Sequence, residues 1–341
     1  MFGIDIHKDN IENKREGACA RYLNIKKDFG DKMPSALFIV GDSSKNIKDG
    51  EAIVSDKDKL IKDIVFGYGN VKDESIGEGV IKNANRGKEG FNISSIQFAI
   101  HYMFENENSL HNFLRNVSEC TRVGGYFIGC CYDGKKIFKL LSNKKEGESE
   151  QINDKDDNKI WEITKRYVNN EFEDNETSLG YAIDVYQDTI GKYFREYLVN
   201  YDYLDRLLTD YGFDLIKQEE SSDIGLPNGV VSTGSFEILY TQMIEDIKKN
   251  KKLAVTFKQA PEMSLNEKKV SFLNNYFIYR KNRVVNTKDI GIKIERTSIE
   301  NKESQEDAAI DQDDKKDIVE EKIEQTLVKP KTRKTKITIK K

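Results

Sequence analysis

The sequence predicts an α/β protein built on an open, largely parallel sheet. Short apolar runs alternate with stretches in which apolar residues recur at helical spacing, and this alternation is typical of a parallel sheet covered by helices. Three of the apolar runs end at polar residues, namely Asp5, the pair Asp42 and Ser43, and Gln97. With 341 residues, 37% of them hydrophobic, the chain is long enough to bury a substantial core.

The first half of the chain contains four of the predicted strands. In chain order we expect a strand at 1–5, a helix at 8–26, strands at 36–44 and 91–98, a helix at 108–122 and a strand at 124–131. Two hydrophilic stretches, residues 67–90 and 143–159, are predicted to be surface insertions.

The second half continues the alternation. The elements expected there are strands within 162–168, 181–190 and 193–199, a helix at 202–213, a strand at 214–220, a helix at 235–249 and a strand at 274–281. The last helix and strand are expected to end the same sheet.

The charge balance excludes a protein that attracts nucleic acid through its overall charge. The 55 Lys and Arg residues nearly balance the 59 Asp and Glu residues, so any contact with RNA or DNA must come from a local patch. The four cysteines, Cys19, Cys120, Cys130 and Cys131, form neither a CxxC pair nor a disulfide framework. Together with the lack of a signal peptide or membrane-length apolar run, this pattern predicts a soluble intracellular protein.

The chain is predicted to have one folded domain, residues 1–281, followed by a disordered charged tail, residues 282–341. No aromatic residue follows Tyr279, and residues 303–321 carry nine acidic side chains. Such a segment cannot bury enough apolar area to offset the entropy of ordering. The last thirteen residues hold seven Lys or Arg, which could bind phosphates, although solubilising the chain is the simpler interpretation.

The polar residues at strand ends are suited to a nucleoside. Ligands of open parallel sheets bind beyond the carboxyl ends of the strands. There Asp5 could accept both ribose hydroxyl hydrogens, Asp42 could accept from an exocyclic amine, and the backbone of Ser43 could donate to a ring nitrogen. Asp and Ser at strand ends also commonly cap helices or form turns, which is the competing interpretation.

A longer pattern resembles a known family. "ISSIQFAIHYMFE" (93–105), the following amphipathic helix, "GGYFIG" (124–129) and "GYAIDVYQDTIGKYFREYLVNYDYL" (180–204) resemble the mRNA cap guanine-N7 methyltransferases, particularly those of large DNA viruses. The resemblance extends over about residues 2–281, with additional residues between 44 and 90 and near 143–159.

The resemblance implies a class I S-adenosylmethionine-dependent methyltransferase, a Rossmann-like fold, that methylates N7 of the guanine capping an RNA 5′ end. The residues that it assigns to the cofactor are Asp5, Asp42, Ser43, Gln97 and the backbone of Phe98, and those that it assigns to the guanine are His101, Tyr102 and Glu196. The implied mechanism is proximity and orientation, with no acid–base residue and no metal.

Each assigned residue also has an ordinary structural interpretation. A histidine that follows an apolar strand is usually a satisfied structural residue, and Glu196 alone fits a solvated strand position. Phe98 and Tyr102 could simply belong to the core. Without the family resemblance these interpretations would be preferred.

The chain departs from the family pattern at its start. Only four residues precede Asp5, so the family's first strand and glycine-rich loop are absent, and neither "GYG" (67–69) nor "GEG" (77–79) forms a strand-to-helix turn. The absent strand is expected between the strands that end at Asp5 and Gln97, and its loss would leave backbone groups unpaired. We therefore expect the natural polypeptide to be longer and the chain alone to bind S-adenosylmethionine poorly.

Two other functions remain compatible with the sequence. One is a non-catalytic methyltransferase-like subunit or fragment that binds RNA or a capping partner, and the absent loop favours it. The other is a small-molecule methyltransferase, which explains the cofactor residues but not His101, Tyr102 and Glu196. The expected partners are 5′-capped RNA (a GpppN end) and upstream capping domains or a partner subunit, in the host cytoplasm or a virion if the protein is viral.

Overall fold

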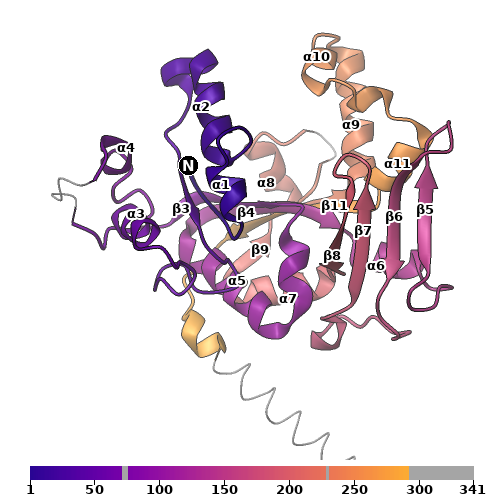
Figure 1. The fold of residues 1–341 in the computed structure, drawn as a ribbon, viewed down its shortest axis with the longest axis horizontal. Helices are drawn as coiled ribbons and strands as arrows, with labels where there is room; N and C mark the ends of the chain where they lie inside the picture. The colour runs from indigo at the N-terminus through magenta and orange to yellow at the C-terminus, as the bar shows by residue number, and fades with distance from the viewer. Residues whose placement is uncertain (71–75, 228–229, 292–341) are drawn as a thin grey trace, which may run out of the picture. The chain divides into compact units, whose positions relative to one another are not determined.

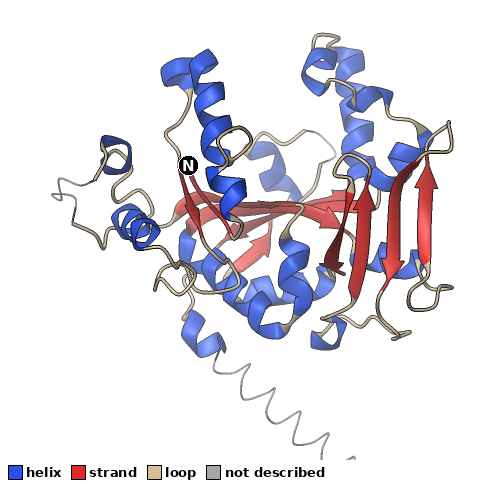
Figure 2. Ribbon diagram, in the orientation of Figure 1, coloured by secondary structure: helices blue, strands red, loops and turns tan. Residues whose placement is uncertain are grey.

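The computed structural model describes residues 1–70, 76–227 and 230–291. The chain divides into two units, Met1–Thr287 and Lys288–Lys341, and the elements discussed below belong to the first unit. Figure 1 shows their order along the chain, and Figure 2 shows that helices lie on both faces of a central sheet. The α/β class predicted from the sequence is confirmed.

The central sheet combines parallel and antiparallel strands. Its strand order is β10 (Thr233–Ser235), β11 (Asn274–Lys281), β4 (Thr121–Tyr132) and β3 (Phe91–Gln97), and β9 (Phe213–Leu215) also pairs with β11. Strands β3 and β4 are parallel, with Gln97 opposite Cys130, whereas β11 is antiparallel to β4. The carboxyl ends of β3 and β4 therefore lie at the same edge.

The first two strands form a separate parallel pair. In it, β1 (Phe2–Asp5) pairs with β2 (Leu37–Val40), and Asp5 is opposite Val40. Among the described residues β1 pairs only with β2, and β3 only with β4. These residues include no strand that is hydrogen-bonded to both β1 and β3. Aromatic side chains connect the two sheets instead. Phe2 stacks on Phe91 with ring centroids 6.1 Å apart, and both rings contact Phe66.

A third, four-stranded antiparallel sheet lies beside the central one (Figure 1). Its strands are β5 (Ser149–Asn153), β6 (Lys159–Lys165), β7 (Ala182–Gln187) and β8 (Lys192–Tyr197). One face packs on helix α6 (Gly134–Leu140) through a core that includes Ile137, Trp161 and Ile163. The prediction of one largely parallel sheet is thus wrong for this half. The connections from β5 to β6 and from β7 to β8 are far shorter than the dozen residues that a parallel crossover needs.

Helices cover the central sheet on both faces. Figure 1 shows α5 and α7 on one face and α1, α2 and α8 on the other. Besides α6, the helices described in the unit include α1 (Lys8–Glu12), α2 (Ala18–Phe29), α3 (Asp56–Phe66), α4 (Glu78–Ile81), α5 (Glu107–Cys120), α7 (Tyr201–Asp210), α8 (Gln218–Asp223), α9 (Phe236–Lys249), α10 (Leu253–Phe257) and α11 (Leu265–Ser271). A 3₁₀ segment, η2 (Ile100–Glu105), joins β3 to α5.

Local hydrogen bonds explain why some helices and strands end at other residues than the sequence predicts. The predicted helix over 8–26 is two helices, because the Asn13 side chain accepts from the backbone of Arg15 and Glu16 and forms a turn between them. The predicted strand over 214–220 ends at Leu215, and α8 follows, with the Glu220 carboxylate accepting from the backbone N–H of Lys217. The predicted insertion over 143–159 contains strand β5, and the one over 67–90 contains helix α4.

The compact unit extends beyond Lys281, the predicted end of the folded domain. The backbone N–H of Asn282 donates to the carbonyl of Gly212 (2.9 Å), and the Thr287 hydroxyl donates to Glu119 (2.7 Å). Most of the predicted tail, residues 292–341, lies outside the described residues. None of the described helices is both long and apolar enough to cross a membrane.

Candidate functional site

Asp5 is the last residue of β1 and Asp42 follows the end of β2 by two residues, so both lie at the same edge of this parallel pair. The Asp5 carboxylate accepts from the backbone N–H of His7 (2.8 Å) and from Asn10 Nδ2 (3.1 Å to each oxygen). It therefore stabilises the turn into α1, as the competing interpretation of the sequence predicts. Since a carboxylate has about four acceptor positions, these bonds leave capacity for a further donor.

The loop after β2 carries Asp42 and Ser43 and begins with a side-chain turn. Asp42 Oδ1 accepts from the backbone N–H (2.9 Å) and hydroxyl (2.6 Å) of Ser44, and Lys45 Nζ lies 3.8 Å from Asp42 Oδ2. The backbone N–H of Asp42 donates to Ala52 O (2.8 Å), which closes the loop on itself. Asp42 is thus oriented by its own loop, and among the described residues Lys45 is the one cation at ion-pair distance from its Oδ2 atom.

Helix α5 holds this loop in place through Asn116, a residue that the sequence analysis did not identify. Asn116 Nδ2 donates to Ser43 O (3.0 Å) and Lys45 O (2.7 Å), and its Oδ1 accepts from the backbone N–H of Ile47 (2.8 Å). The side chain is 3% exposed. One buried amide therefore fixes the backbone at three points of the loop that carries the predicted adenine-binding residues.

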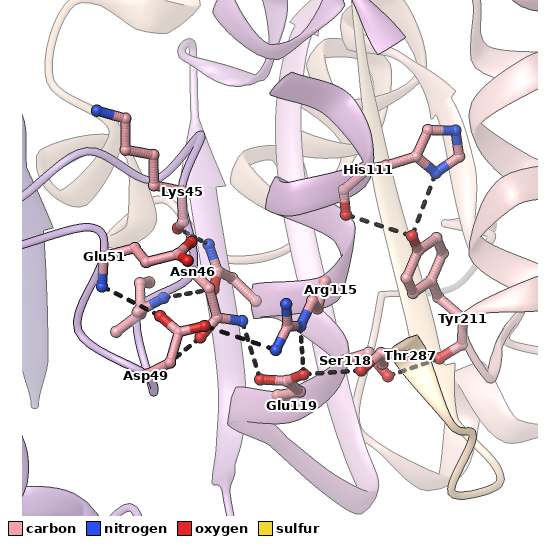
Figure 3. Close-up of polar contacts among 12 residues, drawn as sticks. Lys45, Asn46, Asp49, Glu51, His111, Arg115, Ser118, Glu119, Tyr211 and Thr287 are labelled. Carbon is pink, nitrogen blue, oxygen red and sulfur yellow. Dashed lines mark hydrogen bonds and ion pairs between the residues drawn. The ribbon is translucent and has the colours of Figure 1, made fainter. Parts of the chain in front are cut away.

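Glu119, one turn further along α5, adds a second attachment. It accepts from Asn46 Nδ2 (3.2 Å) of the loop and from Arg115 Nε (2.7 Å), and Arg115 also reaches Asp49 (3.6 Å). Figure 3 shows this chain of contacts between the loop and the helix. No sequence pattern separates such residues from solvated helix positions, because their partners lie about 70 residues away in the chain.

The end of β3 has a strained backbone. Phe98 has a φ of +52°, which is costly for a residue with a side chain, and such residues cluster at ligand sites. Its N–H donates to Cys130 O (2.8 Å), and its ring, 55% exposed, packs edge-on against Phe236. Beside it, Gln97 accepts from Cys130 Sγ (3.0 Å) and donates to Ser95 Oγ (3.0 Å).

Segment η2 brings two predicted guanine-binding residues together. His101 Nδ1 lies 3.6 Å from Glu196 Oε2 of strand β8. Two further hydrogen bonds attach the segment to the antiparallel sheet and the residues next to it. Tyr197 of β8 donates its hydroxyl to Glu105 (2.7 Å), and the backbone N–H of Gly180, just before β7, donates to Phe104 O (3.0 Å). Residues 95 positions apart in sequence thus meet where the central and antiparallel sheets adjoin.

Burial sets the ionisation of this pair. Burial lowers the pKa of His101 to about 3, so the imidazole is neutral, and its Nε2 atom has no hydrogen-bond partner in the part of the chain that the structure describes. Burial also raises the pKa of Glu196 to about 7. Near neutral pH the 3.6 Å contact is therefore not a full ion pair, and Glu196 can exist in either protonation state.

Tyr102 links the residues predicted to bind guanine to those predicted to bind the cofactor. Its ring packs edge-on against His101 with centroids 4.2 Å apart and keeps 43% of its surface exposed. Burial raises the pKa of Tyr102, and the negative charges of Glu196 and Asp5 raise it further. Tyr102 thus lies within electrostatic reach of one carboxylate from each predicted half of the site.

A hydrogen-bonded group supports the antiparallel sheet near Glu196. The Tyr132 hydroxyl accepts from Trp161 Nε1 and from Gln187 Nε2, both at 2.9 Å. Burial raises the pKa of Tyr132 to about 12, and the charge of Glu196 contributes to this shift. The sequence analysis did not identify these residues, because each reads locally as an ordinary strand residue. Within the described ranges, no group of three or more His, Cys, Asp or Glu residues is placed to hold a metal ion.

Comparison with known proteins identifies the family. Residues 2–282 match the mRNA (guanine-N(7))-methyltransferase domain. A probable mRNA-capping enzyme of Acanthamoeba polyphaga mimivirus is 27% identical over 222 residues, which are 64% of this chain and 17% of that protein. The mRNA cap guanine-N(7) methyltransferase of Saccharomyces cerevisiae is 30% identical over 131 residues, or 37% of this chain and 29% of that protein.

The matched regions span well under two thirds of either relative. Among solved structures, a putative S-adenosylmethionine dependent methyltransferase from Listeria monocytogenes aligns with 83% of this chain and 79% of its own, at 13% identity and a TM-score of 0.36. The family match covers all of the strands and helices described above. The chain therefore belongs to the mRNA (guanine-N(7))-methyltransferase domain family.

Proposed function

We propose that this domain transfers a methyl group from S-adenosylmethionine to N7 of the guanine that caps an RNA 5′ end. The observation that carries the proposal is the buried pair of Glu196 and His101, with Tyr102 packed on it and within reach of Asp5. This arrangement offers a carboxylate, a neutral imidazole and an aromatic face at one place. The family match supports the same conclusion.

The strand-end residues fit the nucleoside part of the cofactor. Asp5 has acceptor capacity left for ribose hydroxyls, and the loop that carries Asp42 and Ser43 is fixed by Asn116. The strained turn at Phe98 places backbone groups at the end of β3, where ligands of parallel strands bind. When bound, S-adenosylmethionine supplies an electrophilic methyl group, whose bond to sulfur breaks as its bond to N7 forms.

Guanine is recognised through complementary donors and acceptors. An ionised Glu196 accepts from N1–H and from the 2-amino group, and the neutral His101 has a ring N–H that can donate to O6. Adenine lacks the two adjacent donors and would leave the buried carboxylate unsatisfied. Tyr102 and the exposed ring of Phe98 supply surfaces for base stacking, which contributes about 1–3 kcal/mol per base.

The reaction requires alignment rather than proton transfer. Guanine N7 carries a free lone pair at neutral pH, so no residue must remove a proton before the attack. The side chains of this domain then accelerate the reaction by holding the two reactants close and in line, an effect that can reach an effective molarity of about 10⁵ M or more. His101 need not titrate, which agrees with its low pKa.

Binding of cap analogues tests the proposal. The chain should bind GpppG at least tenfold more tightly than ApppA in isothermal titration, and Glu196→Gln should remove this preference. Glu162→Gln is the matched control, because Glu162 is a paired carboxylate of the same sheet whose partners are Lys159 and Tyr193. Equal binding of the two analogues, or an unchanged preference in Glu196→Gln, would refute guanine recognition.

Methylation and pH dependence give two further measurements. In the longer natural polypeptide that the sequence predicts, transfer of radiolabelled methyl groups to GpppG-capped RNA should be lost in Glu196→Gln and retained in Glu162→Gln. Because Glu196 must lose a proton to accept from guanine, GpppG affinity at pH 6 should be about tenfold below its high-pH limit. Guanine binding without any methyl transfer would instead support a non-catalytic RNA-binding subunit.

We also propose that other capping domains are partners of this domain. The mimivirus relative is named a probable mRNA-capping enzyme, and the matched region is 17% of its length. Co-purification with guanylyltransferase activity from the native source tests this proposal, and its absence would contradict it.

A further inference from the structure

A pocket of about 440 Å³ opens at the edge of the central sheet opposite to the candidate site. Its walls include the first residues of β4, the end of β11 and the end of α5. Thr121 at the pocket pairs with Phe91 of β3, and Cys130 pairs with Gln97, so the two ends are separated by the rise of β3 from Phe91 to Gln97, roughly 20 Å. The pocket is therefore separate from Gln97 at the end of β3, although Lys48 belongs to the loop that carries Asp42 and Ser43.

Four cationic side chains line this pocket: Lys48, Lys88, Arg122 and Lys281. In the described part of the chain, none of the four forms an ion pair. Elsewhere in the domain, cations such as Lys135 have carboxylate partners. What distinguishes the pocket is that four cations without an ion pair to a described residue line one cavity.

The two carboxylates at the pocket do not neutralise it. Glu119 already accepts hydrogen bonds from Arg115, Asn46 and Thr287 (Figure 3). Burial alone would raise the pKa of Glu119, but these hydrogen bonds lower it overall. Glu89 is exposed and forms no ion pair with a described residue. Neither carboxylate is therefore a partner for the cations of the pocket.

Lys281 is the most constrained of the four. It is 6% exposed, and its Nζ donates to the carbonyls of Ser118 and Thr121, which leaves one ammonium hydrogen for another acceptor. Burial lowers the pKa of Lys281, and the nearby charge of Lys48 lowers it further. The negative charge of Glu119 acts on Lys281 in the opposite direction without reversing the shift, and a bound anion would stabilise both lysines further.

We propose that this pocket is a phosphate-binding site, occupied either by the backbone of an RNA or by a free phosphate or nucleotide. A guanidinium and three ammonium groups match the several acceptor oxygens and the high charge of a phosphate group. The pocket volume lies within the range of small-ligand sites. A cap dinucleotide bound at the candidate site is too short to reach it, so a single RNA would occupy both only through its downstream nucleotides.

Titration of the full chain with inorganic pyrophosphate tests the site without involving cap methylation. The double variant Lys88→Gln/Arg122→Gln removes two exposed cations of the pocket and should lower pyrophosphate affinity at least tenfold. The matched control is Lys251→Gln/Lys252→Gln, which removes two exposed cations outside the pocket and should change affinity less than twofold. Urea unfolding of both variants checks that each is folded.

An uncapped 15-nucleotide RNA distinguishes the two sources of phosphate. If the RNA backbone occupies the pocket, the slope of log K against log salt should fall by about 1.4 in the pocket variant, since each lost contact to a single strand reduces it by about 0.7. A loss of pyrophosphate binding with an unchanged slope would assign the pocket to free phosphate or nucleotide. Unchanged behaviour in both titrations would overturn the proposal.

Discussion

Replacement of Asn116 by leucine should destabilise the domain and loosen the loop that carries Asp42 and Ser43. Leucine has the same number and branching of side-chain heavy atoms as asparagine, so the change removes hydrogen bonds without opening a cavity. Three backbone groups lose their partner at once, the carbonyls of Ser43 and Lys45 and the N–H of Ile47. The effect of the substitution can therefore be worked out group by group.

The loss of stability depends on whether water can reach each backbone group after the substitution. Ser43 and Lys45 retain contact with solvent, so water can replace the amide and each loss costs about 1 kcal/mol. Ile47 is buried, and its N–H would remain unpaired at a cost of about 1–3 kcal/mol. The sum is about 3–5 kcal/mol, a large fraction of the total stability of a typical domain.

Urea unfolding of Asn116→Leu measures this loss, and Ser118→Ala is the control. Ser118 lies on the same helix and is equally buried, but it donates one hydrogen bond, to the buried carbonyl of Tyr211 (2.9 Å), and none to the loop, so its loss should cost about 1–3 kcal/mol. The affinity for S-adenosylmethionine should also fall more in Asn116→Leu than in Ser118→Ala. A stability loss in Asn116→Leu no larger than that in Ser118→Ala would refute the reasoning.

Three further predictions concern the guanine side of the site. Glu196→Gln should gain about 3 kcal/mol of stability relative to the wild type as pH rises from 4.5 to 8. Burial raises the folded-state pKa of Glu196 to about 7, so ionisation of this glutamate destabilises the wild type over that range. A difference in urea unfolding that does not change with pH would contradict this. Phe98→Gly should change stability by no more than about 1 kcal/mol, since relief of the positive φ offsets the lost packing and the added entropy of the unfolded chain. The same variant should lower methyl transfer at least tenfold. A stability loss above 2 kcal/mol would show that the ring is mainly structural. Tyr197→Phe should lower stability by about 1 kcal/mol, because it removes the hydrogen bond that attaches Glu105, and with it segment η2, to β8. GpppG binding should weaken for the same reason. Unchanged GpppG affinity would show that η2 is positioned without this bond.

The strand-end residues were accessible to sequence reasoning because the pattern that reveals them is local. An apolar run that stops at Asp5, Asp42 or Gln97 is visible in a few letters, and the structure places all three directly after or at the end of a strand. The same local logic could have indicated the antiparallel sheet. The four residues between β7 and β8 end in Gly191, whose φ of +69° suits a tight turn, and a turn of this length permits only a hairpin.

Other features depend on contacts that no local pattern contains. Strand β5 is a polar edge strand, and Asn266 of α11 donates to its last carbonyl at Asn153 (2.7 Å), so its position is fixed by a helix more than a hundred residues away. Asn116 occupies a helix position where a solvated asparagine would look the same in the sequence. Its role follows only from the loop that packs against it.

The chemistry of Glu196 is also a product of the tertiary fold. On an exposed strand this glutamate would have an ordinary pKa and would distinguish bases poorly, because water would satisfy it whichever base was present. Segment η2, attached through Tyr197 and Glu105, covers it and leaves its side chain 12% exposed beside a neutral His101. The resulting shift in pKa corresponds to about 3 kcal/mol, or more than a hundredfold in an equilibrium. We propose that a base with two adjacent donors recovers this free energy by stabilising the carboxylate, whereas a base without them cannot. On this proposal, the burial that weakens the folded domain is also the physical source of selectivity for guanine.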